Sequence, residues 1–287
     1  MPACILDGKT VAQRLRKSIA DRAAALRQAG KRARLDAVLA ESGGDAAARV
    51  YAHNQERMCS ELGIEYHLHQ VQGGDSRGDL ESLIRRLSTD AQVHALMVHL
   101  PLPDGVDPYP IQSLIAPEKD VEGVNPANIG NIVYGRSSIA PCTALAVLRL
   151  IESTGQPLRG RFAVCVGASD LVGKPVAVLL MRQEATVVSC TKFTQEITGL
   201  TRRADVLVSA TGVPGLVRGD WVRPGAVVID VGICRVIGAD GKSRTVGDLA
   251  FDEVREVAGW VTPVPGGVGP VTVAVLLENV VTAAERR

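Results

Sequence analysis

Short apolar stretches alternate with amphipathic stretches along almost the whole chain, and this alternation constrains the fold more than any other feature. The series is clearest after Arg161, where the apolar stretch FAVCVG (162–167) precedes the helix-like stretch VGKPVAVLLMRQ (172–183). Strands that alternate with helices favour a parallel sheet, because parallel neighbours need a crossover connection. The second half of the chain therefore predicts an α/β, doubly wound, Rossmann-like nucleotide-binding domain.

The first half of the chain shows the same alternation. Strands are expected over 35–42, 64–71 and 93–103, helices over 79–90 and 143–155, and a helix stop at Gly63. The segment 104–130 is rich in Pro, Gly, Asn and Asp, and we expect it to be a long functional loop. The apolar helix expected over 271–287 should pack back on the first domain.

These segments predict an α/β protein of two domains. An N-terminal α/β substrate domain is expected over 1–142 plus 271–287, and a Rossmann-like NAD(P)-binding domain over 143–270. The length of 287 residues is sufficient for two hydrophobic cores.

The composition restricts the partners that this chain can have. A formal net charge of +1 and an aromatic content of 3% give no general attraction for nucleic acid or for acidic membranes. The early basic residues are interleaved with Ala and Leu and indicate a solvated helix face. No leader-like segment and no apolar run long enough to cross a bilayer is evident, so we expect a cytoplasmic protein. The six cysteines show no C-x-x-C spacing, and we expect no metal site.

A glycine turn follows the first strand of the second domain. Gly167 ends the strand and Gly173 lies at the start of the following helix. In a dinucleotide site the first glycine permits the tight turn, the second permits close approach, and the helix amides face a pyrophosphate. The spacing departs from G-x-G-x-x-G, so a plain β–α turn that binds nothing remains the alternative.

The end of the second strand of this domain carries no acidic residue that would hold a ribose diol. Thr191, Lys192 and Thr194 stand there instead. Hydroxyls and a lysine suit a 2′-phosphate, which favours NADP, with NAD as the alternative. Lys192 is equally compatible with a role as an exposed surface lysine.

Several longer motifs carry a family resemblance. The tail TPVPGGVGPVTVAVLLEN, together with PEKDVEGVNPANIG, GASDLVGKPVAVLL and GDWVRPGAVVIDVGI, resembles the methylenetetrahydrofolate dehydrogenase/cyclohydrolase family over nearly the whole chain. The resemblance implies a folate site in the first domain, NAD(P) in the second, a cleft between them and a homodimer. It also implies a role in one-carbon metabolism, in which 5,10-methylenetetrahydrofolate is oxidised to the methenyl compound and this is then hydrolysed.

The resemblance assigns roles to particular residues. It implies that the catalytic residues are Tyr51, Gln55, His99 and Asp120. Residues expected to bind the cofactor are Gly167, Ala168, Ser169, Val172, Gly173, Lys192, Thr211, Gly212, Ile233 and Gly267. Residues expected to bind the substrate are Tyr51, Gln55, His99, Leu100, Pro101, Asp120, Glu122, Asn125, Pro265, Gly266, Gly267 and Thr272. Of these, Asp120 is expected to grip the pterin ring.

The first site departs from the family pattern. The family carries Tyr-x-x-x-Lys, and its lysine, which is central to hydrolysis, is replaced by Gln55. An amide forms hydrogen bonds but exchanges no proton near neutral pH. The family's glutamine is His99, its second acid is Glu122, and Asn125 stands at another changed position. His99 either replaces the lysine as the titrating group or only forms a hydrogen bond with Tyr51 or Gln55.

Three functions remain open at this stage. The first is an NADP-dependent methylenetetrahydrofolate dehydrogenase with weak or no cyclohydrolase activity. The second is a diverged paralogue that acts on another cyclic aminal, imine or iminium compound with the same cofactor. The third is a folate- or nucleotide-binding protein without catalysis.

Overall fold

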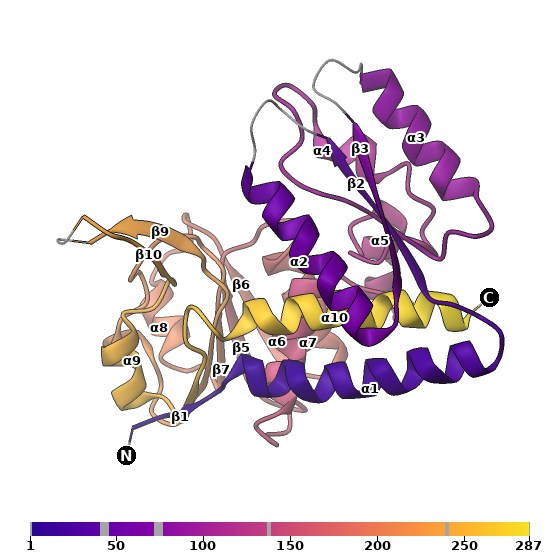
Figure 1. Cartoon of the computed structure of the whole chain (residues 1–287). Coiled ribbons are helices and arrows are strands. Elements are labelled where there is room, and N and C mark those ends of the chain that lie inside the picture. The colour runs from indigo at the N-terminus through magenta and orange to yellow at the C-terminus, as the bar shows by residue number, and fades with distance from the viewer. Residues whose placement is uncertain (1, 41–45, 72–76, 137–138, 239–240, 287) are drawn as a thin grey trace. The chain divides into compact units, whose positions relative to one another are not determined.

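The computed structural model describes residues 2–40, 46–71, 77–136, 139–238 and 241–286 (Figure 1). Its contacts divide the chain into two compact units. Unit 1 comprises Met1–Gln13, Ile132–Arg136 and Pro141–Val275, and unit 2 comprises Arg14–Asn131, Ser137–Ala140 and Leu276–Arg287.

Unit 2 contains a three-stranded parallel sheet of order β3-β2-β4. The strands are β2 (Arg34–Ala40), β3 (Glu65–Val71) and β4 (Ala95–Val98). All three strands were expected, although β4 ends before the predicted prolines, and residues 41 and 42 lie outside the described residues. The central strand β2 is buried along almost its whole length, as expected for a parallel strand covered on both faces.

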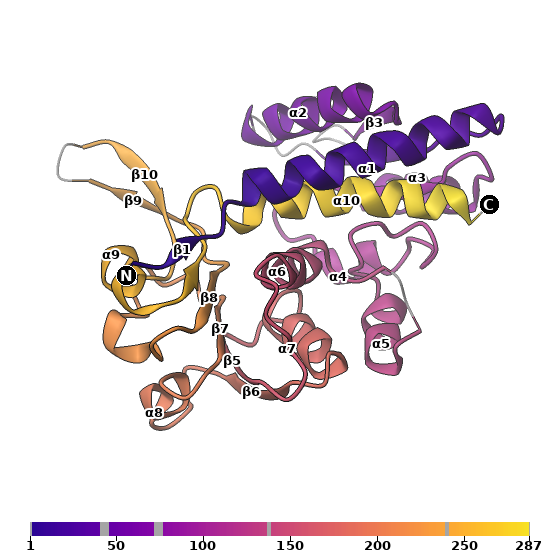
Figure 2. The same cartoon turned by 90° about the horizontal axis from the view of Figure 1, so that it is seen from below.

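Helices connect and flank these strands. They are α1 (Gly8–Gln28), which begins in unit 1, α2 (Ala46–Leu62) and α3 (Arg77–Thr89). The predicted stop of α2 is confirmed, because Gly63 has φ +73° and the Ile64 amide donates to the Cys59 carbonyl oxygen at 2.8 Å. Helices α1 and α10 (Val268–Glu285) lie side by side (Figures 1 and 2), and Arg22 of α1 binds Glu285 of α10 with Nε–Oε1 at 2.9 Å.

The predicted loop 104–130 is wrong in part, because it contains two helices. Helix α4 (Pro108–Gln112) begins with Asp107, whose side chain accepts a hydrogen bond from the Tyr109 amide, and with proline in its first turn. Helix α5 (Pro126–Tyr134) likewise follows Asn125, whose side-chain oxygen accepts a hydrogen bond from the Ala127 amide. Proline and asparagine therefore mark helix starts here rather than irregular backbone.

Unit 1 contains a six-stranded parallel sheet of order β1-β11-β8-β7-β5-β6. The strands are β1 (Cys4–Ile5), β5 (Phe162–Val166), β6 (Thr186–Cys190), β7 (Val206–Ser209), β8 (Val227–Asp230) and β11 (Trp260–Val261). Helices α6 (Cys142–Glu152) and α7 (Gly173–Arg182) lie on one face, and α8 (Ile197–Thr201) and α9 (Phe251–Val257) on the other (Figure 2). The predicted Rossmann-like arrangement is therefore confirmed.

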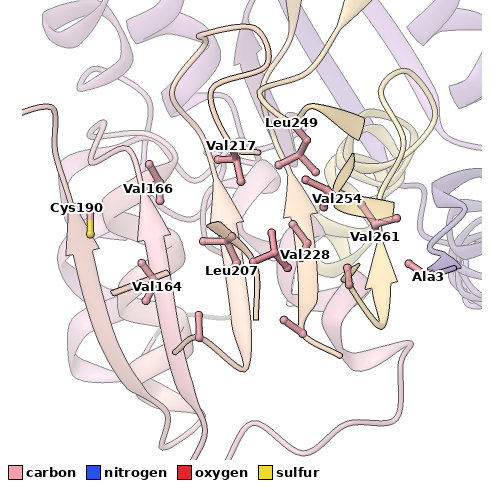
Figure 3. Close-up of a cluster of buried hydrophobic side chains, with 14 residues drawn as sticks. Ala3, Val164, Val166, Cys190, Leu207, Val217, Val228, Leu249, Val254 and Val261 are labelled. Atoms are coloured by element: carbon pink, nitrogen blue, oxygen red, sulfur yellow. The ribbon is translucent and has the colours of Figure 1, made fainter. Parts of the chain in front are cut away.

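The core of unit 1 is formed by small branched side chains on adjacent strands. Val164, Leu207, Val228 and Val261 are buried on one face of the sheet, and Val254 of α9 packs against them (Figure 3). Each fully buried side chain of this size contributes roughly 1.5–3 kcal/mol. The carboxyl ends of these strands are thereby held in fixed relative positions.

Four features of unit 1 and of α10 were not expected from the sequence. A 3-10 turn (Gly219–Trp221) follows β7, and an antiparallel hairpin forms from β9 (Cys234–Ile237) and β10 (Ser243–Val246). Residues 1–13, assigned above to the substrate domain, lie in unit 1 because β1 pairs with β11. Helix α10 is long and apolar enough to cross a membrane by length and composition, contrary to the expectation, although most of it is buried in the protein.

Candidate functional site

Helix α2 places the first two predicted site residues one turn apart. Tyr51 is 46% exposed, whereas the Gln55 side chain is 1% exposed. The Gln55 amide nitrogen Nε2 lies 3.1 Å from Met97 Sδ on β4. Among the described residues, nothing forms a hydrogen bond with the enclosed oxygen Gln55 Oε1. A buried acceptor without a donor costs about 1–3 kcal/mol, so this oxygen is available to a donor from a bound ligand or water.

His99 follows β4 and is 3% exposed. Its ring meets the Tyr51 ring edge-on, with centroids 5.7 Å apart, and its Nε2 lies 3.5 Å from Tyr66 Oη in a long hydrogen bond. Burial lowers the pKa of His99 to about 4. The imidazole is therefore neutral near pH 7.

This environment bears on the two roles left open for His99. A histidine with a pKa of about 4 holds no proton to exchange near neutral pH, so the structure does not support a titrating replacement for the lysine. The hydrogen-bonding role fits the contacts, in which Tyr66 of β3 is a polar partner of His99. Tyr66 could not be identified from the sequence, because its side chain reaches His99 only through the pairing of β2 with β3 and with β4.

Asp120 organises its own loop. Its carboxylate accepts hydrogen bonds from the amides of Gly123 (3.1 Å) and Asn125 (2.7 Å) and from Asn128 Nδ2 (2.9 Å). The side chain is fully buried, and burial raises its pKa although these donors oppose the rise. Both oxygens thus hold the shape of the loop, and the expected grip on a pterin ring stays a prediction.

Glu122 is the acid with unused hydrogen-bonding capacity. Its Oε2 is enclosed and has no partner among the described residues. Burial, followed by the nearby charge of Asp120, raises the pKa of Glu122 to about 8. The carboxyl group is therefore largely protonated at neutral pH and can either donate or accept a hydrogen bond.

The remaining predicted residues of unit 2 have local roles. Asn125 is buried, donates from Nδ2 to the Ile115 carbonyl oxygen at 2.9 Å and accepts from the Ala127 amide, so it fixes the start of α5. Leu100 is 46% exposed and precedes Pro101 through a cis peptide bond.

Unit 1 contains a cavity of about 720 Å³ at the carboxyl ends of its strands. Its lining includes the predicted residues Gly167, Ala168, Ser169, Lys192 and Thr211. In an open parallel sheet, dinucleotides bind at this edge. Residues that the sequence did not suggest also line it, among them Phe193, Ile197, Val213, Leu216 and Trp221.

The two glycines of the predicted turn are required by close backbone contacts. Gly167 has φ +103°, and a Cβ there would overlap the Ala210 carbonyl oxygen. A Cβ at Gly173 would overlap the Gly167 carbonyl oxygen. Ser169 Oγ accepts from the Gly173 amide at 3.3 Å, so one amide at the start of α7 already has a partner.

Lys192 and Phe193 lie together at the rim of this cavity. The Lys192 Nζ atom is 5.1 Å from the centre of the Phe193 ring, which is 77% exposed. A cation over an aromatic face is held weakly at such an exposed position, so the ammonium remains available to an anionic group.

The other predicted residues are dispersed through unit 1. Val172, Gly212 and Ile233 are not among the residues that line the cavity, and Ile233 is 70% exposed. Gly266 has φ +109° and accepts from the Gly8 amide at 2.9 Å, and a Cβ at Gly267 would come within 2.7 Å of the Pro263 carbonyl oxygen. Pro265 follows a cis bond, and the Thr272 hydroxyl donates to the Val268 carbonyl oxygen at 3.2 Å.

Comparison with known families and proteins agrees with this architecture. The profile of the tetrahydrofolate dehydrogenase/cyclohydrolase catalytic domain matches residues 6–122, and that of the NAD(P)-binding domain matches residues 141–287. The chain is 44% identical over 286 residues to the bifunctional protein FolD of Moorella thermoacetica, with 100% of both chains covered.

Two solved structures are similar to the whole chain. The bifunctional FolD of Campylobacter jejuni is 36% identical with a TM-score of 0.93, and 99% of each chain is covered. The FolD of Trypanosoma brucei, solved with NADP cofactor and an inhibitor, is 36% identical with a TM-score of 0.91, and the match covers 100% of this chain and 98% of that one.

Proposed function

The chain belongs to the tetrahydrofolate dehydrogenase/cyclohydrolase family, and on this basis we propose that it oxidises 5,10-methylenetetrahydrofolate to 5,10-methenyltetrahydrofolate with NADP and has little cyclohydrolase activity. The relatives are named bifunctional, so dehydrogenase activity agrees with them and weak hydrolysis departs from them. The proposal of weak hydrolysis rests on one position, Gln55.

The cavity of unit 1 supports binding of NADP. Gly167 and Gly173 allow the close backbone packing of the turn before α7, and Ser169 and Lys192, which line the cavity, offer a hydroxyl and an ammonium to phosphate groups. The trypanosomal relative with NADP supports this cofactor over NAD. NADP, when bound, supplies the hydride acceptor that the oxidation requires.

The oxidation itself makes small demands on the protein's acid–base groups. The bridging carbon lies between two nitrogens whose lone pairs stabilise the cation left when hydride departs. The protein chiefly has to bind and orient the substrate. Gln55 Oε1 and the protonated Glu122 can do so through hydrogen bonds without exchanging a proton.

Hydrolysis of the methenyl product makes larger demands, because a water must lose protons as it attacks. The buried Gln55 cannot take a proton, and the neutral His99 has a pKa of about 4. The absence of a titrating group at position 55 is the observation that carries the proposal. A positioned acid–base group typically contributes about 10²–10⁴-fold to such a rate.

A second candidate keeps the cofactor and changes the substrate. The unpartnered oxygen of Gln55 can accept a hydrogen bond but cannot donate one, whereas the lysine expected from the family would donate. A cyclic aminal or imine that carries an N–H at this point would satisfy it. This observation favours a diverged paralogue as the alternative.

Absorbance assays with the purified protein test both candidates. Methylenetetrahydrofolate is supplied with NADP or with NAD, and reduced cofactor and methenyl product are followed at their separate absorption bands. Reduced cofactor with accumulating methenyl product is expected. No turnover of methylenetetrahydrofolate contradicts the first candidate and favours the second.

The variant Gln55→Lys tests the hydrolysis claim directly. We expect it to raise the rate of methenyl hydrolysis at least tenfold, because burial beside Met97 would lower the lysine pKa toward neutrality. Gln28→Lys, at an exposed position of α1, is the matched control. Rapid hydrolysis by the unmodified protein, above the uncatalysed rate, would show that the claim about Gln55 is wrong.

The oligomeric state and location are also proposals. The family resemblance supports a homodimer, which size-exclusion chromatography with light scattering would test. The cytoplasmic location was expected from the sequence, and cell fractionation would test it.

A further inference from the structure

Two buried carboxylates lie at the carboxyl edge of the unit 1 sheet, outside the set of predicted site residues. Asp230 is the last residue of β8, and Asp248 follows β10; their exposed fractions are 3% and 0%. Within the described part of the chain, neither has a lysine, arginine or histidine as an ion-pair partner. Buried charges without such a partner are costly, so their hydrogen bonds must explain their presence.

Asp248 holds the chain that follows β7. Its Oδ2 accepts from the Thr211 amide at 2.6 Å and from Ser209 Oγ at 2.8 Å. Thr211 lines the cofactor cavity, as do its neighbours Ala210 and Val213. The carboxylate of Asp248 thus holds one wall of that cavity in place, although Asp248 itself does not line the cavity.

Asp230 holds Asp248 in turn. Its Oδ1 accepts from the amides of Asp248 (3.0 Å) and Gly232 (2.9 Å), and its Oδ2 accepts from the Leu249 amide at 3.1 Å. The segment 247–249 is also joined to the chain after β7, because the Val217 amide donates to the Asp248 carbonyl oxygen at 3.0 Å. Three segments at the edge of the sheet are therefore tied to one another through two side chains.

Two glycines next to the pair have no room for a side chain. A Cβ at Gly232 would overlap Asp248 Oδ1, and a Cβ at Gly247 would overlap Asp230 Oδ2. The backbone of the neighbouring segments thus encloses both carboxylates. This close packing restricts the position of each carboxylate.

The pair gives up stability for this geometry. Asp248 Oδ1 is enclosed without a hydrogen-bond partner among the described residues, and burial raises the pKa of Asp230 to about 6. Well-packed apolar residues often stabilise a buried site better than charged ones do. A role in placing the Thr211 amide explains the carboxylates, whereas a role in stability alone does not.

We propose that Asp248, held by Asp230, is a positioning residue for the cofactor, and that it keeps the segment from Ala210 to Val213 in the form that binds NADP. This inference rests on the proposed NADP-dependent function. It gives Asp248 no contact with the cofactor and no part in the substrate site.

The test compares variants of Asp248 in the full-length protein by NADP titration and steady-state kinetics. Asp248→Ala removes the acceptor of Thr211, and we expect the Kd and the KM for NADP to rise about tenfold or more, with kcat at saturating NADP changed less than about threefold. Asp248→Asn keeps an acceptor oxygen and should recover the affinity to within about threefold. Asp252→Ala, an exposed position on α9, is the control and should bind NADP normally.

Outcomes that overturn the proposal are distinct from failure of the proposed function. If the unmodified protein binds no NADP, the proposed function fails first. If it binds NADP and Asp248→Ala binds equally well, or if Asp248→Asn loses as much affinity as Asp248→Ala, the positioning role is wrong. If Asp248→Ala does not fold, Gly232→Ala, whose Cβ would displace Asp248 Oδ1, replaces it, and unchanged NADP affinity then overturns the proposal.

Discussion

The cavity of unit 1 and the proposed substrate site of unit 2 depend on different parts of the chain for their shape and chemistry. Around the cavity, glycines and main-chain amides set the shape, as at Gly167, Gly173 and Thr211. The site of unit 2 depends on side-chain chemistry, as at Gln55 and Glu122, whose enclosed oxygens have no partner among the described residues. A backbone-built site changes only if the chain path changes, whereas a side-chain-built site changes its chemistry with a single substitution.

This difference explains how the chain can keep the family's architecture while part of its chemistry is altered. Gln55, where the family resemblance predicts a lysine, lies on α2 and contacts Met97 of β4. An amide at this position exchanges no proton near neutral pH. Variants at each site test whether this division between backbone and side chain holds.

The largest effect is expected at the glycine turn. Gly167→Ala would place a Cβ against the Ala210 carbonyl oxygen at a φ of +103°, and we expect the NADP dissociation constant to rise about 100-fold or more. Isothermal titration calorimetry measures it. Gly199→Ala is the matched control, because a Cβ there meets nothing within 4 Å. Equal NADP affinity in the two variants would contradict a backbone-built cofactor site.

Glu122→Gln should have the next largest effect. The pKa of Glu122 is about 8 when folded and 4.5 in the reference state, so the folded protein holds the extra proton between these values. The free energy of unfolding therefore falls as pH rises from 4.5 to about 8. The full loss of stability from ionising Glu122 is reached only above pH 8. Glu122→Gln carries no such charge and should be more stable than the unmodified protein at pH 8 by about 2 kcal/mol or more.

Urea unfolding at neutral and at mildly alkaline pH measures this effect. His99 does not interfere there, because its reference pKa of 6.5 and its folded value of about 4 both lie below that range. Glu152→Gln on the exposed end of α6 is the control. If the free energies of unfolding of the unmodified protein and of Glu122→Gln fall equally with pH, Glu122 is ionised in the folded protein at neutral pH.

The smallest effect is expected for His99→Gln. Because burial keeps the imidazole neutral above a pKa of about 4, the pH profile of hydride transfer near neutrality should keep its shape in this variant. The rate itself is expected to change less than about tenfold, through the lost contacts with Tyr51 and Tyr66. Stopped-flow measurement of cofactor reduction against pH checks this. If the pH profile of the unmodified protein shows an inflection near neutral pH and that of His99→Gln lacks it, His99 is the titrating group.

Much of the fold was predictable because its signals are local. The strand 162–166, the glycine turn and the stop of α2 at Gly63 each follow from apolar runs or from backbone geometry that only glycine adopts without strain. Helices α4 and α5 were missed because proline and asparagine mark both loops and helix starts. The β9–β10 hairpin was missed because its strands are largely exposed and lack the buried apolar run that marks the other strands.

The functional residues were predictable to a smaller extent. Tyr51, Gln55 and His99 were identified through a family resemblance, and their spacing in the sequence could say only that two of them share a helix face. The roles of Asp120 and Glu122 depend on which of their carboxyl oxygens already accept hydrogen bonds in the folded protein. The sequence of this short segment does not show that. Tyr66 and Asp248 lie far along the chain from the groups that they contact.

The sequence by itself determined the α/β class, the glycine turn of the NAD(P)-binding domain and the presence of a non-titrating side chain at position 55. These are properties of residue type and of local order, so neighbouring residues suffice to define them. Only the tertiary structure decided that His99 is neutral, that Glu122 holds a proton and that Asp248 supports Thr211. Desolvation and hydrogen bonding depend on atoms that folding brings together from distant parts of the chain.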